Sequence, residues 1–164
     1  MNPLSRDVAR IHFAYSVWAS ARMVEAASRL SEEELTRDHK SADKSVLGTL
    51  VHVFAADRIW YARVTGSPIT KFIDESDYQL TVLQTEWPGL HQWWTEYLDT
   101  ADLSAIITYK DLKGNSHQSP LWQILLHVIN HGTHHRGMVA AMIRSMGQAP
   151  PALDEIAYFR QLAQ

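Results

Sequence analysis

Apolar residues recur every three or four positions over most of the chain, which is the period of a helix with one buried face. The pattern predicts three helices in the first hundred residues, over Ser5–Leu30, 45–65 and 78–100. Ser45 is a suitable N-cap for the second of these, and Gly66 ends it. Most of this part of the chain is therefore expected to be helical.

The period changes between Ala105 and Ser119, where an Ile-Ile-Thr-Tyr run favours a strand and Lys-Gly-Asn favours a turn. This segment predicts a small hairpin. Ser119 then offers an N-cap with Pro120 at the first helical position, so a fourth helix is predicted from there through Met146. The tail after Pro151 can add a last helical turn.

Four long helices, with one long crossover loop and a hairpin inserted before the fourth, predict an all-α four-helix bundle. The length of 164 residues suits a single domain spanning 1–164. With six tryptophans and several apolar helix faces, we expect more apolar surface than one core can hide, and hence a homodimer.

Charge and composition exclude several classes of function. The formal net charge is −3 and no cluster of Lys and Arg is present, so we expect no nucleic acid partner. The first residues show no leader pattern and no run approaches a membrane span, so we expect a cytoplasmic protein without a membrane partner. The absence of cysteine rules out disulfides, Cys-ligated metal sites and a cysteine nucleophile. Imidazole and carboxylate chemistry remain, with nine histidines to supply it.

Four of these histidines lie in the predicted fourth helix, at positions 127, 131, 134 and 135. His131 and His135 are one turn apart on one face, and so are His127 and His131. Two helical histidines at this spacing form half of a zinc or nickel site. Spacing alone does not choose between the two pairs, and histidines that only pack or hydrogen-bond in the core can show the same spacing.

A third ligand must come from another helix, and His52 is the obvious candidate. The residues around it on its own helix face are small (Gly48, Thr49, Ala55 and Ala56), which leaves room for an ion and a bound molecule. Three neutral imidazoles leave one coordination position open, where a water or a thiol can be made more acidic.

Four further residues have two interpretations each. Asp57 can be buried and orient an imidazole or pair with an arginine, or it is a surface charge. Arg136 can bind an anionic group, although a solvated face or a salt bridge is favoured. His12 can supply a fourth ligand or a general base, but an ordinary core or boundary histidine is favoured. His134 can lie near the site, but a packing or supporting role is favoured. His39, His91 and His117 are assigned to the surface.

Two segments carry a resemblance to a known family: His52-Val-Phe-Ala-Ala-Asp57-Arg-Ile-Trp60, and Leu126-His-Val-Ile-Asn-His131-Gly-Thr-His-His135-Arg136-Gly137. Together with the Pro120-Leu-Trp-Gln and Gly147-Gln-Ala-Pro-Pro segments, they resemble the DinB superfamily of DinB/YfiT-like metalloproteins. The resemblance implies a four-helix bundle, commonly a homodimer, in which three histidines bind zinc or nickel. Matched position by position, these are His52, His131 and His135.

The resemblance fixes the site better than the reaction, because some relatives are transferases or isomerases that use a low-molecular-weight thiol and others are taken to be hydrolases. We expect a metal-dependent enzyme, either a thiol-dependent transferase or a hydrolase, that acts on a small molecule. The alternative is a non-catalytic metal-binding or stress-response interaction protein with a structural ion. A fourth protein ligand, such as His12 or His127, would favour the alternative.

Overall fold

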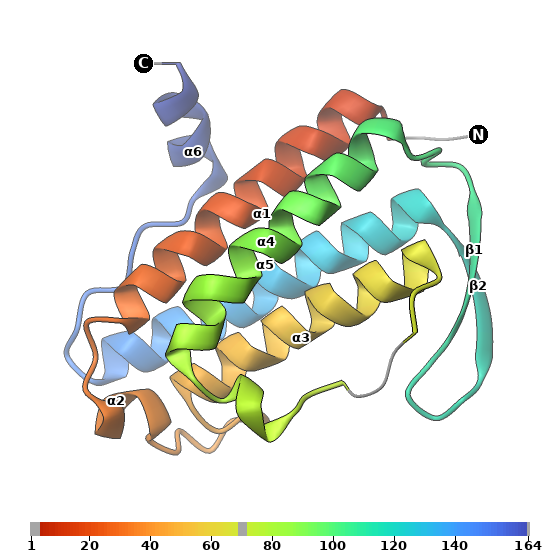
Figure 1. Cartoon of the computed structure of the whole chain (residues 1–164). Coiled ribbons are helices and arrows are strands. Elements are labelled where there is room, and N and C mark those ends of the chain that lie inside the picture. Colours follow the sequence, from red (N-terminus) through yellow and green to blue (C-terminus); the bar gives the residue numbers. More distant parts are fainter. Residues whose placement is uncertain (1–3, 69–71, 164) are drawn as a thin grey trace.

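Four long helices run side by side and enclose the core of the protein (Figure 1). The structure is a computed structural model that describes residues 4–68 and 72–163. The helices are α1 (Arg6–Ala27), α3 (Val46–Thr65), α4 (Leu80–Thr100) and α5 (Leu121–Ser145). Both α1 and α3 pack against α4 and against α5. Each long helix therefore buries side chains against two others.

Five short elements connect or flank these helices: α2 (Glu32–Thr36), the 3-10 turn η1 (Glu75–Asp77), β1 (Ile106–Lys110), β2 (Ser116–Pro120) and α6 (Glu155–Leu162). The two strands pair antiparallel and lie at one end of the helices, while α6 packs on α1 (Figure 1). The prediction of a mostly helical protein with one small sheet is confirmed.

The predicted element boundaries hold for α3, which is capped by Ser45 and ended by Gly66 in a left-handed conformation. They fail at the start of α5, where Pro120, not Ser119, takes the N-cap position and no side chain caps the helix. The reason is that β2 continues to Pro120. The first amides of α5 donate instead to backbone carbonyls of the preceding segment, Leu121 N to Ala105 O at 2.9 Å and Trp122 N to Leu103 O at 2.9 Å.

The core is filled by aliphatic and aromatic side chains from all four long helices. Trp87 and Trp94 of α4 are almost completely buried, whereas Trp93 on the same helix is 56% exposed. The helix in the tail is longer than the predicted single turn, because α6 extends over eight residues. No helix in the described ranges is long and apolar enough to cross a lipid bilayer.

Candidate metal centre

Three histidines from two facing helices converge at one point between α3 and α5. His52 comes from α3, and His131 and His135 come from successive turns of α5. One ring nitrogen of each lies within 4.8 Å of the others, and the Nε2 atoms of His52 and His131 are 3.0 Å apart. The structure therefore brings together the three residues that the family resemblance implies.

The donor set suits a divalent metal ion. Two nitrogens bound to one tetrahedral ion at 2.0–2.1 Å lie about 3.3 Å apart, close to the 3.0 Å between the two Nε2 atoms. Burial, reinforced by the neighbouring histidines, lowers the pKa of His131 to about 3, and burial also lowers the pKa of His135. Both imidazoles are then neutral at pH 7, which is the form that binds a metal. The buried Nδ1 atoms of His131 and His135 have no hydrogen-bond partner among the described residues.

Asp43, in the loop before α3, faces two of the three imidazoles. Its Oδ1 is 3.5 Å from Nδ1 of His52, and its Oδ2 is 3.6 Å from Nδ1 of His135. In His52 this nitrogen is opposite the one that faces His131. These distances are longer than a hydrogen bond, so Asp43 acts on the two imidazoles through its negative charge. Asp43 was not predicted as part of the site, because a loop residue has no periodicity that would place it beside His52.

Gly48 explains how the Asp43 loop approaches the helix so closely. A Cβ at position 48 would lie 2.2 Å from the backbone carbonyl oxygen of Asp43. The space beside this glycine is thus occupied by the loop, which differs from the expectation that it is kept for an ion or a bound molecule. Ala56, one turn beyond His52, lines a pocket as expected.

The other two histidines of α5 lie beside the group but outside it. The ring of His127 is 5.7 Å from that of His131 and packs on Trp60, and exposed His134 is 5.0 Å from His135. The structure therefore groups His131 with His135 and His52, and His127 stays one turn away. Spacing alone left two possible histidine pairs on α5, and the position of α3 places His52 beside the pair His131 and His135.

The remaining histidines are placed partly as predicted. His12 of α1 lies at a boundary, with its Nδ1 2.8 Å from Oε1 of Glu155 in α6, so it is an ordinary boundary histidine. His117 is exposed, as expected. The surface assignment fails for His39, which is half-buried, and for His91, which is 7% exposed. His91 was misjudged from its polar neighbours in sequence.

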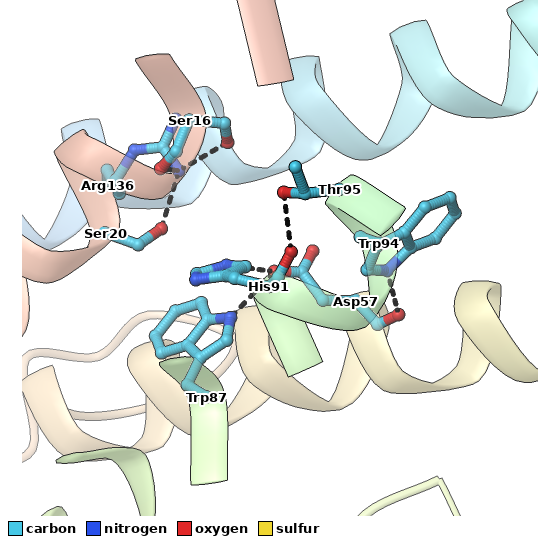
Figure 2. A network of polar contacts seen from close by, with 8 residues as sticks. All are labelled: Ser16, Ser20, Asp57, Trp87, His91, Trp94, Thr95 and Arg136. Carbon is cyan, nitrogen blue, oxygen red and sulfur yellow. Dashed lines mark hydrogen bonds and ion pairs between the residues drawn. The ribbon is translucent and has the colours of Figure 1, made fainter. Parts of the chain in front are cut away.

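Asp57 is buried, 6% exposed, and its contacts are with side chains of α4 (Figure 2). Its Oδ2 accepts a hydrogen bond of 2.8 Å from the indole of Trp87 and lies 3.3 Å from Nε2 of His91. Trp94 donates to its backbone oxygen at 3.0 Å. Asp57 therefore joins α3 to α4, and the expectation that it orients a metal-binding imidazole finds no support in these contacts.

Arg136 is also buried, at 2% exposed, so the expectation of a solvated face is wrong. Its guanidinium donates to the hydroxyls of Ser16 and Ser20 on α1, at 3.2 and 3.0 Å (Figure 2). It also donates to the hydroxyl of Thr133 at 3.1 Å. Burial lowers the pKa of Arg136, while the negative charge of Asp57 acts in the opposite direction. The sequence gives no sign of these contacts, because the two serines are more than a hundred residues away along the chain.

Two glycines of α5 should respond oppositely to alanine. A Cβ on Gly132 would lie 2.7 Å from Nη1 of Arg136, which three hydroxyls hold in place, whereas a Cβ on Gly137 would meet nothing within 4 Å. We expect Gly132→Ala to lower the free energy of unfolding by about 1–3 kcal/mol, and Gly137→Ala to raise it by up to about 1 kcal/mol. Urea denaturation of both variants checks this. Equal effects would contradict the described packing of Arg136.

A pocket of about 450 Å³ opens beside the three histidines. His131 and His127 line it from α5, Ala56 and Trp60 line it from α3, and the turn between β1 and β2 forms its rim. Phe72 also lines it and packs edge-on against His52, with ring centroids 5.7 Å apart. A small molecule in this pocket would therefore lie next to the histidine cluster.

Comparison with known proteins gives the family. The model of the DinB family matches residues 6–162. The chain belongs to the DinB family. It is also similar to the protein named DinB of Bacillus subtilis (strain 168), with 22% identity over 151 residues that cover 87% of this chain and 88% of that protein. DinB family membership and the three-histidine cluster are together compatible with the binding of a divalent metal ion.

Proposed function

We propose that this DinB family protein is a metal-dependent enzyme built on a four-helix bundle. In this proposal His52, His131 and His135 hold one divalent ion, zinc or nickel, and the substrate is a small molecule. The ion would supply Lewis acidity, which lowers the pKa of a coordinated thiol or water. The reaction is thiol-dependent transfer or hydrolysis.

The observation that carries the proposal is the combination of three converging imidazoles with an adjoining pocket. No fourth histidine or carboxylate joins the group in the ranges that the structure describes, and His131 itself lines the pocket. Three protein ligands with access from a pocket are typical of catalytic sites, whereas structural sites use four protein ligands. This arrangement favours the enzyme over a protein with a purely structural ion.

Each neighbouring residue has a definite part in the proposal. Asp43 acts through its negative charge on the imidazoles of His52 and His135 from the side of their Nδ1 atoms. Phe72 covers His52, and its segment is held in place by the ion pair between Arg58 and Asp77, at 2.6 Å, and by a 3.2 Å hydrogen bond from Arg58 to the carbonyl of Phe72. The apolar cover excludes water from one side of the cluster and strengthens electrostatic interactions there.

Metal analysis followed by a thiol titration tests this function. Elemental analysis of protein purified without chelator should give about one zinc or nickel ion per chain. With cobalt in its place, glutathione should produce a sulfur-to-metal charge-transfer band, and because the chain has no cysteine, any such band comes from the added thiol.

The outcomes separate the possible functions. A band with thiol supports the transferase, and a cobalt spectrum that responds to hydroxide and carboxylates but not to thiols supports the hydrolase. A spectrum that responds to none of these indicates a closed structural site and contradicts the enzyme. A chain that binds neither zinc, nickel nor cobalt contradicts the metal site itself.

A further inference from the structure

We propose that Arg63 binds the anionic end of a small substrate or cosubstrate, a carboxylate or phosphate group, at the far end of the pocket from the three histidines. The inference deepens the proposed function, because the other end of the same molecule would lie at the histidine cluster. It rests on the position of Arg63, on its lack of a partner, and on the wall that joins it to His131.

Arg63 lies on the same stripe of α3 as His52. Ala56 and Trp60 lie between them on this stripe, at helical spacing. Ala56, Trp60 and Arg63 all line the pocket. The guanidinium carbon of Arg63 is 4.5 Å from the ring centre of Trp60 and 5.3 Å from that of Tyr109. Since Trp60 precedes Arg63 on the helix, the side chain is directed back towards His52.

The cation of Arg63 has no anionic partner within the described part of the chain. Its Nε is buried and makes no hydrogen bond there, and no carboxylate among those residues lies within 4.0 Å of the guanidinium. Arg58, five residues earlier on α3, contrasts with it, because Arg58 makes two hydrogen bonds to Asp77. A half-buried guanidinium that keeps its charge without a partner carries a desolvation cost that a bound anion would offset.

Asp111 lines the same pocket, and its negative charge acts on Arg63, but its hydrogen bonds go to the turn between β1 and β2 and to His117 of β2. Its Oδ1 accepts from the backbone amides of Lys113 and Asn115, at 2.8 and 2.9 Å, and its Oδ2 accepts from the Asn115 side chain at 2.9 Å. The turn also places Lys113 at the rim of the pocket. Two cationic side chains, Arg63 and Lys113, thus line a pocket in which the carboxylate of Asp111 is already hydrogen-bonded within the hairpin.

A continuous aromatic wall leads from Arg63 to the histidine cluster. Tyr109 contacts Trp60 with ring centroids 4.9 Å apart, Trp60 contacts His127 at 5.2 Å, and His127 contacts His131 at 5.7 Å. Arg63 is eleven residues beyond His52, which corresponds to about 16 Å along the helix axis before the side chain reaches back. A molecule with an anion at one end and a metal-binding group at the other can therefore lie along this wall.

The test compares acidic and neutral thiols of matched length. A series of ω-mercaptocarboxylic acids of increasing chain length, and the corresponding mercaptoalcohols, are titrated into the cobalt-loaded protein and followed by the charge-transfer band. At the best chain length the acid should bind about ten- to a hundredfold more tightly than the alcohol, as expected for a charged hydrogen bond. Arg63→Met should remove this preference while leaving the affinity for the alcohol unchanged, and Arg63→Lys should retain part of it.

The matched control is Arg22→Met, which removes another arginine stacked on a tryptophan, with its guanidinium carbon 5.0 Å from the ring centre of Trp18 on α1. This variant should keep the full preference for the acid. A preference that is absent in the parent protein, or that survives in Arg63→Met, overturns the proposal.

A second measurement separates this inference from the metal site. In the NMR spectrum of the zinc-treated protein, the Arg63 Nε–H signal, assigned from its loss in Arg63→Lys, should shift when the same acid is added and not when the alcohol is added. This signal reports on the anion whether or not zinc is bound. A shift of the Arg63 signal without any cobalt spectrum would support the anion site and contradict the metal site. A cobalt–thiolate band without a shift of the Arg63 signal would support the metal site and contradict the anion site.

Discussion

His131→Ala is expected to abolish stoichiometric zinc or nickel binding, from about one ion per chain to less than about a tenth. His131 contacts His52 directly and lies one turn from His135, so its loss leaves two imidazoles that cannot close the site. His52→Ala and His135→Ala should have the same effect. Elemental analysis after dialysis measures the bound ion, and circular dichroism confirms that each variant is folded.

His127→Ala and His134→Ala are the matched controls on the same helix, and both should keep the ion. Asp43→Asn should give an intermediate result, with affinity reduced about ten- to a hundredfold, because it removes the charge that faces two imidazoles without removing a ligand. If His127→Ala lost the ion and His135→Ala kept it, the alternative histidine pair would be the correct one.

Asp57→Ala should lower the free energy of unfolding by about 3 kcal/mol or more. The substitution leaves the buried indole N–H of Trp87 without its acceptor and removes the carboxylate beside His91. It also removes a negative charge that acts on buried Arg136. Urea denaturation measures the loss.

Glu86→Ala on α4 provides the comparison, since Glu86 is exposed and its removal should change stability by less than about 0.5 kcal/mol. An Asp57→Ala variant as stable as Glu86→Ala would show that the carboxylate does not hold α3 and α4 together.

The helices and the histidine group were predictable because both follow from helical periodicity. A stripe of apolar residues marks α3 and α5, and the same period places His131 and His135 on one face. What periodicity does not supply is the partner helix, and the choice between His127 and His135 needed either the resemblance or the structure. The burial of His91 could have been predicted in the same way, because His91 shares a face of α4 with Trp87 and Trp94.

Contacts between distant segments account for the rest of what was missed. Asp43 reaches the cluster through a loop whose path depends on Gly48, and Arg136 is buried through hydroxyls supplied by α1. Neither loop path nor long-range hydroxyl contacts leave a repeating pattern in the sequence. Arg63 was missed for a related reason, since an arginine without a partner looks the same in sequence as one that has a partner.

The turn between β1 and β2 has a consequence for how such a protein can diversify. The histidines belong to core helices, whereas the rim of the pocket is formed by residues 111–115, which connect two strands outside the core. Connecting segments accept insertions and substitutions at little cost to stability, and helix-core positions do not. A change in this turn can therefore alter which molecules are accepted while the histidine cluster is inherited intact, so that selection can act on specificity and on chemistry separately.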